Sequence, residues 1–189
     1  MLSGAGRTLL LVIGALAIVF GSFWTTLMVL DYWGTPEPAY DAASLPRLAP
    51  GQTLSFANGQ NRSVLLAGWS VPEGQGSWSL GNTAYLGFVV GDRPGEVKQA
   101  ILHALVFLVA DKLKEQKVEV WSGGKQLTKF VLKDAVVELR IPLADVPMSN
   151  DRPVILKFYL PDAHSPQDLQ SGQDKRVIAI QITSLQLAP

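Results

Sequence analysis

A segment rich in tryptophan and glycine, residues 68–81, holds the side chains best suited to binding chemistry. Trp69 and Trp78 lie on either side of Glu73, and four glycines fall within the same 14 residues. Tryptophan rings stack on the C–H faces of sugars, and a nearby carboxylate accepts hydrogen bonds from hydroxyl groups. Glycine lets the backbone approach a ligand closely. We therefore predict a saccharide platform made of Glu73 and Trp78, with Trp69 as a further candidate for carbohydrate binding.

The same residues have a structural alternative, in which both tryptophans plug the open end of a β-sandwich and Glu73 pairs with a buried arginine. A second polar segment, residues 161–169, leads through Asp174 and Arg176 into the last predicted strand. Its Asp, Ser and Pro residues are typical of a long loop that ends in a structured turn. Asp174 and Arg176 either hold this loop by an ion pair or offer polar groups to a ligand.

Groups for catalysis are few. His103 lies within an apolar run and His164 in a loop, and Ser165, His164 and Asp162 are too close in sequence to form a triad, whose members come from separate elements. The chain has no Gly-x-Ser-x-Gly elbow, no phosphate loop and no cysteine, which excludes thiolate catalysis and Cys-based zinc sites. A glycosidase pair of carboxylates remains an alternative, but nothing marks one. We predict no enzymatic activity, no cofactor and no metal.

The charge balance argues against nucleic acid as a partner. Sixteen basic and sixteen acidic side chains cancel, whereas phosphate binding needs clustered lysine and arginine.

An uncharged apolar run occupies residues 9–30. A helix of this length is about 33 Å long, which matches the ~30 Å hydrocarbon core of a bilayer. Arg7 precedes the run and Asp31 follows it, so the positive-inside rule places residues 1–8 in the cytoplasm and the rest outside. We predict a single-pass protein of the bacterial inner membrane with a periplasmic C-terminal domain. A cleaved signal peptide is the alternative, although the run is long and lacks a good cleavage site.

Small residues form a stripe on one face of this predicted helix at spacings of three and four: Gly14, Ala17, Gly21 and Thr25. Such a stripe allows another membrane helix to pack closely, although glycine and alanine are also common in membrane helices. Residues 31–50 follow, with prolines concentrated from position 36 on, and predict an extended linker between the membrane and the outer domain.

Period-two alternation dominates residues 51–189. It is clearest in residues 117–121, 137–141, 154–160 and 178–182, and a change of parity after residue 183 predicts a bulge near Ser184. Turn residues such as Gly123 and Gly124 separate the short runs. The pattern predicts an all-β antiparallel sandwich of the jelly-roll or carbohydrate-binding-module kind. Residues 97–110 stay ambiguous, because their apolar spacing also fits a helix.

An ordered set of motifs carries a family resemblance. It consists of Gly68-Trp-Ser-x-Pro-Glu73, Gly76-Ser-Trp78-Ser-x-Gly81, the Ser122-Gly-Gly124 turn and Ser165-Pro followed by Asp174-x-Arg176. The set resembles a poorly characterised bacterial β-sandwich domain of inner-membrane proteins that transfer sugar or phosphoglycerol to the cell envelope. The resemblance implies a strand from Leu102 to Val109 and a shared cluster of Glu73, Trp78, Asp174 and Arg176. The family's hairpin usually turns at Asn-Gly, where this chain has Gly123-Gly124.

Three functions follow from these expectations. The first is a non-catalytic accessory subunit of a membrane glycosyltransferase or polysaccharide synthase, whose helix packs on the synthase and whose outer domain guides the emerging glycan. The second is an independent membrane-tethered carbohydrate-binding module, and the third is a structural assembly factor. The neutral composition favours a neutral glucan as the polymer.

Overall fold

The computed structural model describes residues 37–189, and within this range no helix has the length and apolar character needed to cross a membrane. The predicted transmembrane helix 9–30, its small-residue stripe, the cytoplasmic residues 1–8 and the first part of the linker lie outside the described residues. The described domain is the compact unit Pro38–Pro189.

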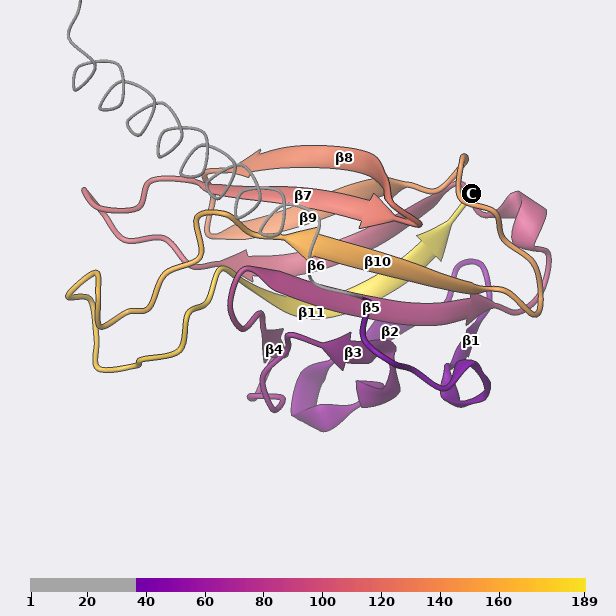
Figure 1. The fold of residues 1–189 in the computed structure, drawn as a ribbon, viewed down its shortest axis with the longest axis horizontal. Coiled ribbons are helices and arrows are strands. Elements are labelled where there is room, and N and C mark those ends of the chain that lie inside the picture. Colours follow the sequence, from indigo (N-terminus) through magenta and orange to yellow (C-terminus); the bar gives the residue numbers. More distant parts are fainter. Residues whose placement is uncertain (1–36) are drawn as a thin grey trace, which may run out of the picture. The chain divides into compact units, whose positions relative to one another are not determined.

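Two β-sheets pack face to face, which confirms the predicted sandwich (Figure 1). Sheet A has the order β1-β5-β10-β7-β8, with β3 also paired to β5, and sheet B has the order β2-β11-β6-β9, with β4 also paired to β11. All pairs are antiparallel except β1 with β5. The strands are β1 (Arg47–Leu48), β2 (Thr53–Ser55), β3 (Leu65–Ala67), β4 (Ser77–Trp78), β5 (Thr83–Val90), β6 (Gln99–Val106), β7 (Gln116–Ser122), β8 (Lys125–Leu132), β9 (Val136–Pro142), β10 (Pro153–Tyr159) and β11 (Ile180–Ala188). Four short 3-10 helices join them: η1 (Ala42–Ser44), η2 (Ala57–Gly59), η3 (Arg62–Val64) and η4 (Pro94–Glu96).

The core lies between the sheets and consists of the inward-facing residues of each strand. Leu86 and Phe88 of β5 and Phe158 of β10 face Leu102 of β6 and Ile180 of β11, and all five are fully buried. Because side chains of a strand alternate between its two faces, this assignment also fixes which residues point away from the core.

The hairpin of β7 and β8 turns at Gly123 and Gly124, as predicted. Their φ angles are +54° and +78°. Two-residue hairpin turns of the favoured type need positive φ at both central positions, which glycine adopts without steric cost.

Residues 99–106 form a strand, so the helical alternative for residues 97–110 is wrong. The strand begins and ends three residues earlier than Leu102–Val109. Ala100, Leu102 and Ala104 are buried on the core side, whereas Leu105 is only half-buried on the opposite face. The apolar spacing of a helix arose here because both faces of the strand carry apolar residues.

The predicted bulge near Ser184 is confirmed. The pairing of β11 with β6 shifts register between Ile182 and Ser184. The extra residue lets Ile182 and Leu185 both point into the core despite their odd spacing.

The linker prediction is wrong from Pro38 to Pro50, because this segment belongs to the domain. Leu48 is 2% exposed, and β1 pairs with Val89 and Val90 of β5. Leu45 packs on the outer face of sheet A in an apolar cluster with Tyr85, Val89 and Ile155. The prolines do not prevent this packing, because Leu45 and Leu48, which lie between them in sequence, are both buried against the sandwich. The domain therefore begins at Pro38 instead of Gly51.

Candidate functional site

Arg176 joins three of the predicted site residues. Its guanidinium contacts Asp174 through Nε and Nη2, at 2.9 Å and 2.6 Å from Oδ2, and its Nη1 contacts Glu73 Oε1. The Arg176 backbone N–H also donates to Asp174 Oδ1, at 2.9 Å. These side-chain and backbone hydrogen bonds from Arg176 lower the pKa of Asp174, and the two carboxylates raise the pKa of Arg176. The predicted Asp174–Arg176 ion pair is confirmed.

This ion cluster connects two loops. Glu73 lies between β3 and β4, in a tight turn closed by Gly76, and Asp174 precedes β11. Arg176 is the partner that the structural alternative required for Glu73, but its side chain is 39% exposed instead of buried. Arg176 forms an ion pair with each of the two carboxylates, so the cluster links the loop of Glu73 to the segment that precedes β11.

Trp69 is half-buried and packs against the core of the sandwich. Its Nε1–H donates to the Tyr85 carbonyl at 2.8 Å, and its ring meets Phe158 edge to face with centroids 6.0 Å apart. This position matches the structural alternative for Trp69, and the ring does not form a platform with Trp78.

Trp78 lies on the outer face of sheet B. Ser77 and Ser79 on either side of it are fully buried, so the Trp78 side chain points the other way. It pairs with Gln181 of β11, whose Nε2 lies 3.4 Å from the Glu73 carbonyl. Trp78 is half-buried, and Gln181 is its link to the loop that carries Glu73. The structure thus joins Glu73, Asp174 and Arg176 through hydrogen bonds, holds Trp78 on the neighbouring strand β4, and packs Trp69 against the core.

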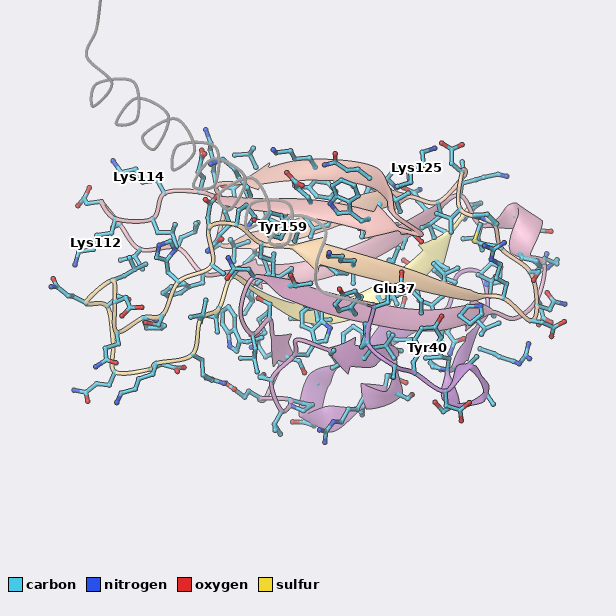
Figure 2. All side chains as sticks on the ribbon, in the orientation of Figure 1. Glu37, Tyr40, Lys112, Lys114, Lys125 and Tyr159 are labelled. Atoms are coloured by element: carbon cyan, nitrogen blue, oxygen red, sulfur yellow. The ribbon has the colours of Figure 1, made fainter. Side chains whose placement is uncertain are left out.

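The outer face of sheet A carries a second group of aromatic and charged residues, which sequence reasoning did not select as a site. Val120 and Phe158 point into the core, so their neighbours in the strands, Trp121 on β7 and Lys157 and Tyr159 on β10, point outward. Figure 2 labels Tyr159 on this sheet. We call Trp121, Tyr159, Lys157 and Glu119 the sheet A site.

The strand register arranges these four residues as a square. Lys157 is opposite Trp121, and Tyr159 is opposite Glu119. Residues at such positions lie about 5 Å apart across the strands, and diagonal ones about 7–8 Å. The two aromatic rings therefore occupy one diagonal and the two charges the other. Trp121, Lys157 and Tyr159 are half-buried.

Glu119 is a buried carboxylate with incomplete hydrogen bonding. Its side chain is 9% exposed, and Oε1 accepts a bond from Lys129 Nζ at 3.1 Å. Oε2 is buried and has no hydrogen-bond partner in the described domain. Burying a carboxylate oxygen without a hydrogen-bond donor is costly, which makes this atom unusual in the domain.

A sequence signal for this site existed. The alternation of residues 117–121 predicts a strand and places Glu119 and Trp121 on the face opposite Val118 and Val120. Glu119 and Trp121 are two of the four residues of the sheet A site. Their proximity to Lys157 and Tyr159 depends on the pairing of β7 with β10, which no local pattern indicates.

His164, Ser165 and His103, the side chains considered for catalysis, contact neighbouring residues of the fold. His164 Nδ1 lies 2.8 Å from the Asp162 carbonyl, and the Ser165 hydroxyl accepts a bond from the Asp168 backbone N–H at 3.0 Å. His103 lies on β6 and faces Glu138 of β9, with 3.8 Å between Nε2 and Oε2. Residues 37–189 contain no group of three or more potential metal ligands.

Comparisons with family models and with curated proteins found no match. Among solved structures, an acetyl xylan esterase (Est2A) from the rumen bacterium Butyrivibrio proteoclasticus is similar over 73% of this chain, with 11% identity and a TM-score of 0.48. A carbohydrate-binding module specific for non-crystalline cellulose, CBM28, matches 76% of this chain and 97% of its own, with 11% identity and a TM-score of 0.43. The module CBM36, solved with calcium and xylotriose, matches 72% of this chain and 99% of its own, with 11% identity and a TM-score of 0.40. This chain spans about a third of the length of the esterases, 32% for Est2A.

Proposed function

We propose that residues 38–189 form a non-catalytic domain that binds a glycan at the sheet A site. The observation that carries this proposal is the square of residues on β7 and β10. Two half-buried aromatic rings, Trp121 and Tyr159, flank Glu119, whose buried Oε2 lacks a hydrogen-bond donor in the described domain.

Each part of the square suits a sugar. A pyranose ring has apolar C–H faces that stack on aromatic rings, and hydroxyl groups at its edge that donate and accept hydrogen bonds. The rings of Trp121 and Tyr159 supply the stacking surfaces. The carboxylate of Glu119 accepts from hydroxyl groups, and the ammonium of Lys129, which is half-exposed beside it, donates to them.

At the scale of the whole chain, we propose an accessory subunit of a membrane glycosyltransferase or polysaccharide synthase in the bacterial inner membrane. The support comes from the sequence: an uncharged run at residues 9–30, small residues at Gly14, Ala17, Gly21 and Thr25 for packing on a partner helix, and motifs that resemble a domain of cell-envelope sugar transfer. In this arrangement the carbohydrate-binding-module-like domain contacts the periplasmic glycan as the synthase extrudes it.

Glycan binding is tested with the full chain in mild detergent, titrated with soluble oligosaccharides that include cellohexaose and oligogalacturonate. Trp121→Ala and Tyr159→Ala are expected to weaken the tightest of these interactions by about 1–3 kcal/mol each, or roughly 5- to 150-fold. Val136→Ala is the control, because Val136 is exposed on the other sheet and its removal should not change affinity. Unchanged affinity in both aromatic variants would refute the sheet A site.

The same titration with Trp78→Ala distinguishes the two surfaces. Binding that depends on Trp78 and not on Trp121 would place the glycan at the platform predicted from the sequence. Binding to no oligosaccharide in the panel, together with a lowered melting temperature in these variants, would favour the structural assembly factor.

The subunit proposal is tested by purification from native membranes in mild detergent. A membrane glycosyltransferase is expected to co-purify, and replacement of Gly14 and Gly21 by leucine should reduce its yield, because bulky side chains prevent close helix packing. A chain that elutes as a lone monomer would contradict this proposal and would leave the tethered carbohydrate-binding module as the function.

A further inference from the structure

Lys157 occupies the centre of sheet A. It lies on β10 between its register partners Tyr85 of β5 and Trp121 of β7. Its neighbours along the strand, Leu156 and Phe158, are fully buried in the core, so the Lys157 side chain points outward. The side chain is half-buried.

The Lys157 ammonium has no ion pair or hydrogen bond within residues 37–189. The other lysines on this face are paired. Lys129 binds Glu119 at 3.1 Å, and Lys117 lies 3.5 Å from Asp162 and 3.8 Å from Glu115.

Among residues 37–189, no charged side chain therefore forms an ion pair with Lys157. The carboxylate at the diagonal position is Glu119, which is already engaged by Lys129, and the directly opposite residues on both neighbouring strands are aromatic and uncharged. Lys157 is half-buried, and its register partners on both neighbouring strands are aromatic. An anion placed beside its ammonium would form a charge-assisted hydrogen bond.

We infer that the sheet A site binds an acidic glycan, with a carboxylate or phosphate substituent of the sugar paired to Lys157. This inference rests on the proposed glycan-binding function and deepens it. The rings of Trp121 and Tyr159 stack on the sugar, Glu119 accepts a hydroxyl hydrogen bond, and Lys157 selects the charged substituent. It replaces the neutral glucan that the overall composition favoured, because a net charge of zero does not exclude one locally uncompensated cation.

The test uses matched probes and the full chain in mild detergent. Oligogalacturonate carries one carboxylate per sugar, and its fully methyl-esterified form has the same rings without the charge. The wild-type chain is expected to bind the acidic form at least ten-fold more tightly in low salt. The preference should shrink as salt is raised from 50 to 500 mM, since screening weakens interactions of exposed and half-exposed charges.

Lys157→Met keeps the apolar stem and removes the charge. It is expected to reduce affinity for the acidic probe about ten-fold, to that for the ester, while leaving the ester unchanged. Lys157→Arg, which retains the charge, should preserve the preference and serves as a check that the site is intact. Lys114→Met is the control for general charge effects, because Lys114 is exposed at one end of the sandwich and has no partner in the described domain (Figure 2).

The outcomes separate this inference from the proposal on which it depends. Equal affinity of the wild-type chain for the two probes would overturn the acidic-glycan inference, and so would a preference for the acidic probe that survives Lys157→Met. In either case the glycan-binding proposal still stands if Trp121→Ala weakens binding. Failure to bind either form would overturn the inference as well. Recognition of phosphate is tested by comparing a phosphoglycerol-substituted oligosaccharide with its unsubstituted form. The acidic substituent is identified by whether this phosphorylated probe or oligogalacturonate binds more tightly.

Discussion

Three tryptophans illustrate how differently one residue type is used in this protein. Trp69 is hydrogen-bonded and packed on the core, Trp78 is half-buried on the outer face of sheet B, and Trp121 is half-buried on the outer face of sheet A. All three rings are half-buried, so burial does not distinguish them. A ring packed against the core contributes to stability through its contacts, whereas a ring on the outer face of a sheet is replaced without opening the core. The position of each ring therefore separates the stability effect of its replacement from the effect on binding.

Trp69→Phe should destabilise the domain by about 1–2 kcal/mol, because the Tyr85 carbonyl loses the indole N–H donor while most of the apolar contact remains. Thermal unfolding of the full chain in detergent measures this loss as a lower melting temperature. Trp78→Phe is the matched control, since no hydrogen bond from the Trp78 indole is present in the described part of the chain, and its effect should stay within about 0.5 kcal/mol. Equal effects of the two variants would contradict the assigned roles.

The carboxylate of Asp174 should contribute to stability in a pH-dependent way. Hydrogen bonds from Arg176 lower its pKa below the ordinary value of 3.8, so the contribution is complete above that value and is lost as the pH falls through the lowered pKa. The melting temperature of Asp174→Asn is expected to be below that of the wild type by a constant amount above about pH 5. The difference should vanish on further acidification. A difference that grows towards low pH would contradict the ion pair.

Among the elements, the short strand β4 depends on a close approach of two backbones. Gly76 lies so near β11 that a Cβ atom there would be 2.0 Å from the Ile182 carbonyl oxygen. Only glycine allows this contact. The close approach places both residues of the predicted platform, Trp78 and Glu73, beside β11.

Gly76→Ala should cost about 3 kcal/mol, because one of the two backbones must move to accommodate the methyl group. Gly74→Ala, two residues away, is the control: it has a positive φ of +44° but open space around it, so about 1 kcal/mol of backbone strain is expected. Melting temperatures of the two variants measure the difference. A larger effect at Gly74 would show that β4 and β11 are not in this close contact.

The hairpin turn offers a stabilising change. Gly123→Asn should raise the free energy of unfolding by about 0.4–1 kcal/mol, because asparagine tolerates the positive φ of this position and restricts the unfolded chain more than glycine does. Gly123→Val, with a β-branched side chain at the same φ, should instead destabilise the domain. Both are measured by thermal melts, and a stabilising valine would be inconsistent with the turn geometry.

At the scale of the molecule, the domain includes the segment that joins it to the N-terminal part of the chain. Residues 38–50 contribute β1 to sheet A and bury Leu45 and Leu48. Leu45 covers one part of the outer face of sheet A, over Val89 and Ile155, and Ile155 precedes Lys157 on this face of β10. The segment thus limits how far the sheet A site can extend.

A fragment of residues 38–189 should be more stable than a fragment of residues 51–189. Loss of two buried leucines costs about 1.5–3 kcal/mol each, so a difference of about 3 kcal/mol or more is expected in chemical denaturation. Leu48→Ala in the longer fragment tests the same contact and should cost about 2–4 kcal/mol. Equal stability of the two fragments would support the spacer that the sequence suggested.

Local patterns were sufficient for a large part of the fold. Alternation in residues 117–121, 154–160 and 178–182, glycines at 123 and 124 and the parity change near Ser184 each correspond to a strand, turn or bulge in the structure. These features depend on neighbours within a few residues. Local patterns fail in two segments. In Pro38–Pro50 no alternation is visible, because β1 is only two residues long. In residues 97–110 the pattern does not distinguish a helix from a strand, because both faces of β6 carry apolar residues.

By itself the sequence determined that the chain has an uncharged run at residues 9–30, that strands dominate the rest, and that Glu73, Trp78, Asp174 and Arg176 are candidates for one cluster. Only the tertiary structure decided that Trp69 packs against the core and that β7 lies beside β10, which assembles Trp121, Tyr159, Lys157 and Glu119 into one surface. The physical reason is that alternation states which residues share a face of one strand. Which strands are neighbours depends on packing between segments about forty residues apart, and no local period encodes that choice.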